Sequence, residues 1–512
     1  MSSESTNWVN GNESKFRQLQ TQLTTCWQPI NCFDREPRQI LVVPSLSLDQ
    51  EELSKVRGAN HYEERLLFSL LHLRNPNTSL IYVTSQPLHP SIVDYYLELL
   101  PGIPSSHAQS RLRLFSTYDG SQRPLTEKIL NRPRLIKRIH QCLSPREAYM
   151  VCFNSTNWEK QLALTLNIPL MAVSPTLLNL GTKAGSREIF SECNVPHPAG
   201  SSLIYCVKDL AIAAANLWEQ QPNLKRIVIK LNEGFSGEGN ALLRLDELAT
   251  FAPSQAPHEQ RVSALLEALK QMRFQYIHET WENFSRKIEE LGAIAEAFIE
   301  GDIKRSPSVQ GHITPSGEVE ILSTHDQILG GPDGQIFLGC RFPADASYRM
   351  ALQSMGRRVG EVLAKRGALE RYSVDFIAVQ TGKQHWDLSA IEINLRKGGT
   401  THPFMALQLL TNGSYSLEDG QFYTPQGQPK YYRASDNLQK DQYKGLLPDD
   451  LMDIIMLEQL HFNSIAGTGA AFHLMGCLSE YGKLGLTCIG NTPKEAEQIY
   501  EQVVAALDRE TS

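Results

Sequence analysis

Two oxygen-bearing side chains and an arginine alternate along the segment Ile-Glu-Ile-Asn-Leu-Arg, residues 391–396. Successive side chains of a β-strand point to opposite faces, so Glu392, Asn394 and Arg396 share one face. Asp375, in the segment Val-Asp-Phe-Ile, adds a carboxylate from a neighbouring predicted strand. Mg²⁺ prefers such hard oxygen ligands, completed by water and phosphate. The pattern predicts a metal site beside an arginine that can hold an anion bidentately, with a solvent-facing amphipathic strand as the alternative.

A lysine ends a second predicted strand, 227–230, and the glycine-rich segment 231–239 follows it. Glycines let backbone N–H groups close over phosphate oxygens, and a buried Lys230 would place a positive charge beside them. The alternative is a plain hairpin loop with a surface lysine. A third piece, 181–198, has Lys183 opening a predicted helix that ends in Val-Pro-His-Pro. Alone, this third piece is typical of any short helix.

The elements that must position these residues divide the chain into regions. From 37 to 178, short apolar runs alternate with helical periods, which predicts a parallel sheet covered on both faces. Its first turn, Pro-Ser-Leu-Ser-Leu, has no glycine to admit a phosphate, so a dinucleotide site is not indicated there. We expect the remaining regions to be a loosely ordered N-terminal extension (1–36), a second domain (179–412) with a helical insert (253–292), a polar linker (413–440) and a small α/β lobe (441–512).

Composition excludes several classes of function. The chain has 512 residues, 41% of them hydrophobic, and a net charge of −7, which argues against nucleic acid or an anionic membrane as the main partner. Its nine cysteines form no CxxC pair, as is typical of reduced thiols in the cytoplasm. No signal peptide and no apolar run of roughly 18 residues is present. We expect a soluble cytoplasmic protein, and a homo-oligomer is compatible with the sequence.

Taken in order, these pieces resemble the ATP-grasp superfamily over residues 179–403. The family's lysine-led helix with its Pro-x-Pro turn matches 183–198, and its strand lysine and glycine loop match 230–239. Its adenine-binding hinge strand matches 296–301, and its acidic strand pair matches Asp375 and 392–394. The run 392–403 is similar to the closing motif of the biotin-carboxylase branch, and 485–500 is similar to the C-terminal lobe of that branch and of purine ligases. The whole layout is most similar to the pheganomycin-type peptide ligases.

The resemblance implies an α/β (α+β) ATP-grasp fold, preceded by a parallel-sheet pre-ATP-grasp domain and followed by a small C-terminal α/β lobe. It implies an ATP- and Mg²⁺-dependent carboxylate–amine ligase that forms an amide or peptide bond through an acyl phosphate. Mn²⁺ is an alternative metal. The implied metal ligands are Asp375, Glu392 and Asn394, and the implied catalytic residues are Arg396 and Lys230. The implied ATP-binding residues are Lys183, Lys230, Gly234, Ser236, Gly237, Gly239, Glu296, Ala297, Phe298, Ile299 and Glu300.

The resemblance leaves some points open. The insert 253–292 is longer than in compact members, so the ribose contact is either Glu300 or Asp302. His325 and Arg341, on strands expected to line the cleft, are candidates for contact with a small-molecule carboxylate or amine substrate. Two other functions remain as alternatives: a carboxylase-type enzyme that activates bicarbonate, and a catalytically silent nucleotide-binding regulator. The first would need a partner chain, because the sequence has no biotinyl-lysine motif and no glutaminase domain.

Overall fold

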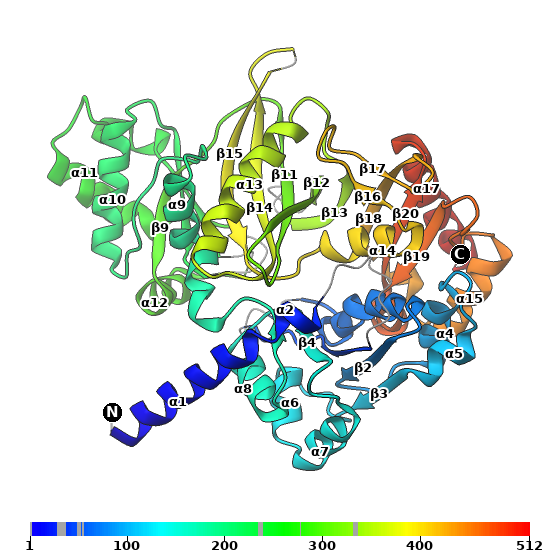
Figure 1. Ribbon diagram of the computed structural model, residues 1–512. Coiled ribbons are helices and arrows are strands. Elements are labelled where there is room, and N and C mark those ends of the chain that lie inside the picture. Colours follow the sequence, from blue (N-terminus) through cyan, green and yellow to red (C-terminus); the bar gives the residue numbers. More distant parts are fainter. Residues whose placement is uncertain are drawn as a thin grey trace.

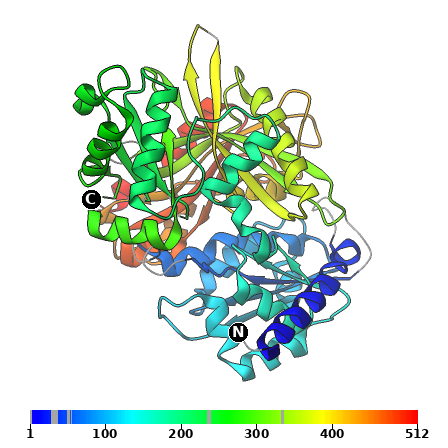
Figure 2. The same ribbon diagram turned by 90° about the vertical axis from the view of Figure 1, so that its left-hand side faces the viewer.

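The strands of the protein, seen in a computed structural model, fall into three sheets (Figure 1). A five-stranded sheet lies at the bottom of the view, a four-stranded sheet at the upper left, and an eleven-stranded sheet runs from the centre to the right. Figure 2 shows from a second side that the N-terminal part lies below the rest of the molecule. The structure describes residues 3–27, 37–48, 53, 56–233, 239–276, 278–330, 336–383 and 385–511.

The five-stranded sheet is parallel throughout, with the order β3-β2-β1-β4-β5. Leu41 and Val43 face a core shared with α6, α7 and α8, whereas Ile40 and Val42 face η1 and α4. Helices therefore cover both faces, as the alternating pattern predicted. The elements are β1 (Arg38–Val43), the 3₁₀ helix η1 (Ala59–Arg74), β2 (Thr78–Thr84), α4 (Pro90–Glu98), α5 (Ser105–Ser110), β3 (Leu112–Ser116), α6 (Leu125–Leu130), α7 (Pro133–Cys142), β4 (Ala148–Cys152), α8 (Asn157–Leu166) and β5 (Leu170–Met171).

The N-terminal segment differs from the loosely ordered extension that we expected over 1–36. It contains the helices α1 (Ser3–Gln20) and α2 (Leu23–Cys26). Buried apolar residues recur at helical spacing and face the sheet, while the Ser, Asn and Gln residues that suggested disorder occupy the remaining positions. The Gln20 side chain both donates to and accepts from the Leu170 backbone at 2.8 Å. The buried residues are Phe16, Leu19, Leu23 and Cys26.

The four-stranded antiparallel sheet has the order β8-β7-β6-β9. We expected residues 253–292 to be a helical insert, but they complete this unit: β8 extends the sheet, and Leu265 and Phe284 share its core with α10. After the connecting η2 (Pro175–Gly181) and α9 (Lys183–Glu192), the elements are α10 (Val207–Gln220), β6 (Arg226–Leu231), β7 (Asn240–Arg244), η3 (Asp246–Phe251), α11 (His258–Leu269), β8 (Arg273–Phe274), α12 (Trp281–Leu291) and β9 (Ala293–Ala297).

The eleven-stranded sheet is antiparallel, and β14 lies between β11 and β15. Helix α13 (Arg349–Lys365) contacts β11 and β12. The strands are β10 (Lys304–Arg305), β11 (Pro307–Ile313), β12 (Val319–Gly330), β13 (Ile336–Phe342), β14 (Glu370–Gln380), β15 (Trp386–Asn394), β16 (Ser414–Tyr415), β17 (Phe422–Tyr423), β18 (Pro429–Gln439), β19 (Gly469–His473) and β20 (Lys483–Gly490).

The segment 413–440, expected to be a polar linker, contains three of these strands. Strand β18 pairs with β13 on one side and with β20 on the other, so the sheet continues without a break into the C-terminal segment. Two charged residues of β18 are buried in ion pairs: Asp436 with Arg65, and Arg433 with Glu497 at 3.5 Å. Polarity in this strand therefore marks buried charge pairs and not solvent exposure.

The C-terminal segment packs against the N-terminal sheet. One core contains Leu67 and Tyr96 from η1 and α4 together with Phe472 and Leu486 from β19 and β20. No helix in the described part of the chain is long and apolar enough to cross a bilayer. Helix α14 (Thr401–Thr411) precedes the C-terminal segment, residues 441–512. The helices of that segment are η4 (Asp441–Tyr443), α15 (Pro448–Leu457), η5 (Met475–Cys477), α16 (Leu478–Tyr481) and α17 (Pro493–Glu510).

Candidate active site

A cavity of about 1370 Å³ lies between the four-stranded and the eleven-stranded sheet. The four-stranded sheet contributes residues of β6, β7 and β9 to its wall, and the large sheet contributes residues of β12, β13, β14, β15, β18 and β20. The helix η1 of the N-terminal part completes it. Most residues predicted from the sequence to bind nucleotide or metal come together here.

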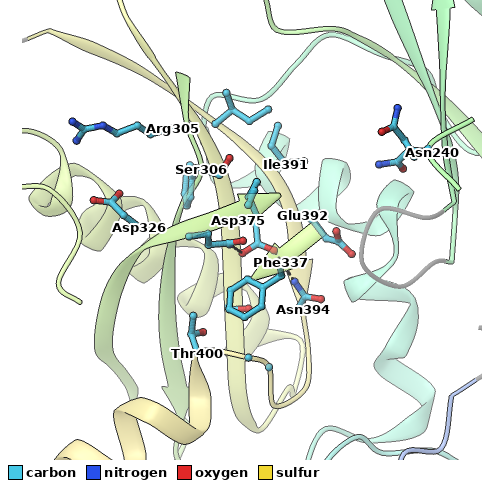
Figure 3. A pocket seen from close by; sticks show the side chains of 18 of the residues that line it. Asn240, Arg305, Ser306, Asp326, Phe337, Asp375, Ile391, Glu392, Asn394 and Thr400 are labelled. Carbon is cyan, nitrogen blue, oxygen red and sulfur yellow. Dashed lines mark hydrogen bonds between the residues drawn. The ribbon is translucent and has the colours of Figure 1, made fainter. Parts of the chain in front are cut away.

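The acidic strand pair forms one wall of the cavity, where Asp375, Glu392 and Asn394 lie close together (Figure 3). Asp375 stands directly opposite Glu392 in the β14–β15 ladder. The Asn394 Nδ2 donates to one oxygen of Asp375 at 3.1 Å, and the Gln327 Nε2 donates to the other at 2.7 Å. Burial, and then the charge of Glu392, raises the pKa of Asp375 to about 7. A bound cation would relieve this repulsion, so the donor set fits Mg²⁺.

A register shift in the same ladder changes one expected orientation. We expected Ile391 to face away from Glu392, but Ile391 lines the cavity as well. The ladder shifts between Asp375 and Phe376, so that Phe376 pairs with Ala390 and Ile391 has no direct partner. Such a bulge interrupts strict alternation. The cavity thus gains an apolar wall next to the acidic side chains.

Lys183 reaches the acidic wall from the first turn of α9, where its ammonium pairs with Glu392. Asn232, which follows β6, holds this helix start: its carbonyl accepts from the Lys183 N at 3.1 Å and its side chain from the Ala184 N at 3.0 Å. The Ser186 hydroxyl accepts from the Ile393 N of β15 at 2.9 Å. Helix α9 is thereby fixed to both walls of the cavity.

Lys230, at the end of β6, lies opposite the acidic wall and pairs with Glu296 of β9. The Arg187 guanidinium donates to the second oxygen of Glu296 at 2.7 Å. Although burial opposes it, the two cations hold the pKa of Glu296 below its ordinary value. Both lysines that the sequence indicated as phosphate ligands are therefore buried beside the cavity and paired with carboxylates.

The predicted adenine-binding segment follows β9, and Ala297, Phe298 and Ile299 all line the cavity. The Phe298 ring lies between two cations, 3.8 Å from the Arg226 guanidinium carbon and 4.5 Å from the Lys304 ammonium. The ribose contact stays open between Glu300, which pairs with Arg226, and Asp302, which is exposed. Neither of these two carboxylates lines the cavity.

The predicted glycine loop joins β6 to β7 beside the cavity. Gly234, Ser236 and Gly237 lie outside the described residues. Gly239 is described, and its carbonyl accepts from the Leu231 N at 2.9 Å. Lys230 pairs with Asn240 across the two strands, and both side chains line the cavity.

Arg396 and Arg341 both line the cavity. Burial lowers the pKa of the Arg396 guanidinium, and the nearby charges of Glu392 and Asp375 oppose that shift. Arg396 thus stands beside the acidic wall, where we expected an anion ligand. The Arg341 guanidinium is about half exposed, and its Nε donates to Glu497 at 3.0 Å.

His325 does not contact the cavity, which corrects our expectation of a substrate-binding role. Its side chain is fully buried, and its Nε2 lies 2.6 Å from the Tyr432 hydroxyl. Burial lowers the pKa of His325 to about 3. The next residue, Asp326, does line the cavity, because neighbouring residues of a strand point to opposite faces. The sequence indicated the correct strand, β12, but the side chain that lines the cavity is that of Asp326 and not that of His325.

Several cavity residues carry no sequence motif. They lie on segments far apart in the chain, so no local spacing signals them. Sequence reasoning also missed Asn232, which does not line the cavity but holds the start of α9. Its place two residues after the strand lysine Lys230 is a signal that could have been used. Within the described residues no group of three His, Cys, Asp or Glu side chains forms a ready metal site. The cavity residues without a motif include Tyr62, Arg65, Asp436 and Lys483.

Comparison with family models agrees with this geometry. The model described as "IQCH-like, ATP-grasp" matches residues 176–264 and 253–418, and the model "PGM1 C-terminal domain" matches residues 450–503. The first match covers every residue predicted to bind ATP or metal. The sequence match, the fold and the arrangement of the site all agree with the expected resemblance to the ATP-grasp superfamily.

Two curated relatives align with most of this chain. The L-propargylglycine–L-glutamate ligase of Streptantibioticus cattleyicolor is 29% identical over 465 residues, which cover 89% of this chain and 91% of the relative. The IQ motif-containing protein H of Danio rerio is 25% identical over 456 residues, covering 80% of this chain and 43% of that longer protein. The expected similarity to an ATP-grasp ligase is confirmed by the first of these relatives.

Solved structures confirm the expected fold. A biotin carboxylase from Campylobacter jejuni in complex with βγ-ATP has a TM-score of 0.54 at 15% identity, covering 90% of this chain and 89% of that chain. An N5-carboxyaminoimidazole ribonucleotide synthetase in complex with ADP has a TM-score of 0.51 at 9% identity, covering 93% and 97%. At such low identity these similarities describe the fold alone.

Proposed function

We propose that this protein is an ATP- and Mg²⁺-dependent carboxylate–amine ligase that forms an amide or peptide bond through an acyl phosphate. The observation that carries the proposal is that Lys230, Asp375 and Glu392 line one cavity and that Lys183 reaches its acidic wall through an ion pair with Glu392. Each lysine is already paired with a carboxylate, so the site is charge-balanced before ligands enter it. The ligase relative, which spans most of this chain, supports the same reaction class.

The residues divide the work by their chemistry. ATP bound with Mg²⁺ would supply the phosphoryl group and neutralise its charge. Lys183 and Lys230 would bind and orient phosphate oxygens, and Asp375, Glu392 and Asn394 would hold the metal, for which Mn²⁺ is the alternative. Arg396 would hold the substrate carboxylate next to the acidic wall. The residues that would line the base pocket are Ala297, Phe298 and Ile299.

The remaining parts of the proposal concern partners and location. The substrates are a small-molecule carboxylate and a small-molecule amine, and neither nucleic acid nor a membrane is a partner. The net charge of −7 supports this, since phosphate-backbone binding favours a basic surface. The eight described cysteines are all free, which supports a location in the cytoplasm. A homo-oligomer is compatible with the proposal.

The test is phosphate release from ATP and Mg²⁺ across a panel of acids and amines. A ligase requires one acid and one amine together for turnover. Release that needs bicarbonate alone would indicate the carboxylase alternative, and tight ATP binding without release would indicate a silent regulator. Either result would contradict the proposal.

Glu392→Gln sharpens this test because it removes a charge from the metal site and preserves the side-chain shape. We expect turnover to collapse, with partial recovery at high Mg²⁺ or with Mn²⁺, and little change in the melting temperature without ligands. Glu290→Gln is the matched control, since Glu290 pairs with Arg286 on α12 at 3.1 Å and does not line the cavity. Unchanged Mg²⁺ dependence in Glu392→Gln would remove the metal assignment.

A further inference from the structure

One part of the cavity has no role in the reaction described above. Its wall comes from three distant segments: Tyr62 and Arg65 of η1, Asp436 of β18 and Lys483 of β20. Arg396 lines the same cavity as Arg65, and it follows β15, the strand that carries Glu392 of the acidic wall. A molecule held at Arg396 would therefore lie in the same cavity as two further cations, Arg65 and Lys483.

Lys483 is the first observation. Its side chain is only 4% exposed, yet it lines the cavity. Its ammonium donates to the Tyr62 hydroxyl at 2.9 Å, and within the described residues it makes no ion pair with a carboxylate. A buried ammonium is costly unless charge or hydrogen bonds compensate it. One hydroxyl satisfies only one of its three donors.

Arg65 is the second, independent observation. It is 6% exposed and pairs through one terminal nitrogen with Asp436. Its Nε is buried and has no hydrogen-bond partner. Its guanidinium lies over the Tyr62 ring at 4.6 Å and over the Phe153 ring at 5.6 Å, which fixes its plane. The guanidinium is thus oriented before any ligand arrives, as anion recognition favours.

Charges within this part do not balance. Arg57, Arg65 and Lys483 line it together with the carboxylate of Asp436; the other described carboxylates that line the cavity outside the acidic wall lie on β9, on β12 and after β13, and they are Glu296, Asp326 and Asp345. Glu64 lies nearby but does not line the cavity; its oxygens face the Gly476 N at 3.1 Å and the His61 ring at 3.5 Å. The excess positive charge requires an anion. The phosphates already have Lys183 and Lys230 on the other side of Arg396.

We propose that Tyr62, Arg65 and Lys483 bind the carboxylate that does not react, on an amino acid or peptide substrate. The inference rests on the proposed ligase function and specifies its substrate class. An amino acid that reacts through its amine keeps its α-carboxylate, and an acidic amino acid that reacts through one carboxylate keeps the other. A planar carboxylate can accept from the Lys483 ammonium and the Tyr62 hydroxyl while the Arg65 guanidinium stabilises its charge.

The experiment measures phosphate release with ATP and Mg²⁺ and pairs of proteinogenic L-amino acids, each supplied as the free acid or as its α-carboxamide. The panel also contains simple acids and amines that lack a second carboxylate. We expect turnover with an amino-acid pair, and a KM about 10- to 150-fold higher when the non-reacting carboxylate of one partner is amidated. The KM for ATP should not change.

Lys483→Gln should raise the KM of the free acid to that of the carboxamide and leave the KM of the carboxamide and of ATP unchanged. Tyr62→Phe, a smaller change, should raise the KM of the free acid in the same selective way if Lys483→Gln does not fold. Lys430→Gln is the matched control. Lys430 is also a buried lysine, but it does not line the cavity, and its ammonium bonds Asn491 at 2.7 Å and the Ala466 carbonyl at 3.0 Å.

The outcomes separate this inference from the ligase proposal. Equal KM values for acid and carboxamide in the wild type, or an equal rise for both in Lys483→Gln, would overturn the carboxylate site. Turnover only with acids and amines that lack a second carboxylate would also overturn it, and would leave the ligase intact. No phosphate release with any acid and amine would overturn both.

Discussion

Each of the two lysines predicted to bind phosphate, Lys183 and Lys230, has a carboxylate partner that a nucleotide would have to share. Lys230 pairs with Glu296, which Arg187 also holds, whereas Lys183 pairs with Glu392 of the acidic wall. A phosphate oxygen can replace one carboxylate contact without leaving a buried charge unpaired, because Glu296 keeps Arg187. The site is therefore prepared for anions at little cost in desolvation.

Lys230→Met tests this at the level of one side chain. We expect ATP binding to weaken by about 1.5–3 kcal/mol, the usual contribution of a hydrogen bond to a charged group, and turnover to be nearly lost. Isothermal titration calorimetry with ATP and Mg²⁺ measures the first effect. Lys270→Met is the control, because Lys270 pairs with Glu267 on the outer surface of α11. Wild-type affinity in Lys230→Met would exclude this lysine from the site.

His325→Gln tests whether that side chain is structural. We expect near wild-type turnover, since His325 is buried against Tyr432 and does not line the cavity. Burial lowers the pKa of His325 to about 3, so between about pH 6.5 and 3 the unfolded chain binds a proton that the folded chain does not. The stability that this group supports is complete above pH 6.5 and is lost as the pH falls.

The same variant should therefore resist acid better than the wild type. Between pH 6.5 and 5 the wild type should lose about 2 kcal/mol more free energy of unfolding than His325→Gln, at about 1.36 kcal/mol per pH unit. Urea unfolding at pH 5, 6.5 and 8 measures this, and the difference between the two proteins should be constant from pH 7 to 8. A large loss of turnover at pH 8 would restore a functional role.

At the level of elements, sequence reasoning succeeded where one strand or helix carries its own pattern. The alternation 392–394 correctly put Glu392 and Asn394 on one wall of the cavity, and the strand lysine Lys230 also lines the cavity. It failed where distant partners decide. Strand β18 was interpreted as part of a polar linker. Its charged residues are in fact buried in ion pairs with Arg65 and Glu497, and both partners lie far from β18 in the sequence. The bulge beside Asp375 depends on pairing with β14 and has no local signal either.

Asn232 shows how elements are joined at the site, since it links the end of β6 to the start of α9. We expect Asn232→Ala to cost about 0.5–1.5 kcal/mol of stability and also to raise the KM for ATP, because Lys183 and Lys230 lose their fixed separation. Steady-state kinetics and thermal unfolding measure the two effects. Thr280→Ala is the control. The Thr280 hydroxyl caps α12 by accepting from the Asn283 N, and its removal should lower stability by a similar amount.

The control should lower the melting temperature without changing the KM for ATP. If Asn232→Ala behaved in the same way as Thr280→Ala, the link between β6 and α9 would be structural only. If neither variant changed stability, the side-chain contact between Asn232 and the Ala184 N would contribute nothing. Both results would contradict the positioning role.

At the scale of the whole molecule, the N-terminal part and the C-terminal segment share one core, although the residues in contact, such as Tyr96 and Phe472, are 376 positions apart in the sequence. The Tyr96 hydroxyl donates to the Phe472 carbonyl, and the Tyr95 hydroxyl accepts from the Phe472 N, both at 3.0 Å. Residues 441–512, which we expected to form a separate lobe, therefore stabilise the first domain of the chain. The proposed carboxylate site lies at the same junction, between η1 and β20.

Phe472→Ala tests whether these distant parts unfold together. The side chain is buried between α4 and the C-terminal strands, so its truncation should cost about 3–5 kcal/mol. If the two parts form one cooperative unit, amide hydrogen exchange should accelerate in β1 and β2 as well as in β19 and β20. Phe284→Ala, an equally buried phenylalanine in the core of the four-stranded unit, should accelerate exchange there and leave β1 and β2 protected. Faster exchange in β19 and β20 alone after Phe472→Ala would mean that the N-terminal sheet is stable by itself. In that case the junction would be an interface between independent domains, and ligand binding across it could be tuned without unfolding either one.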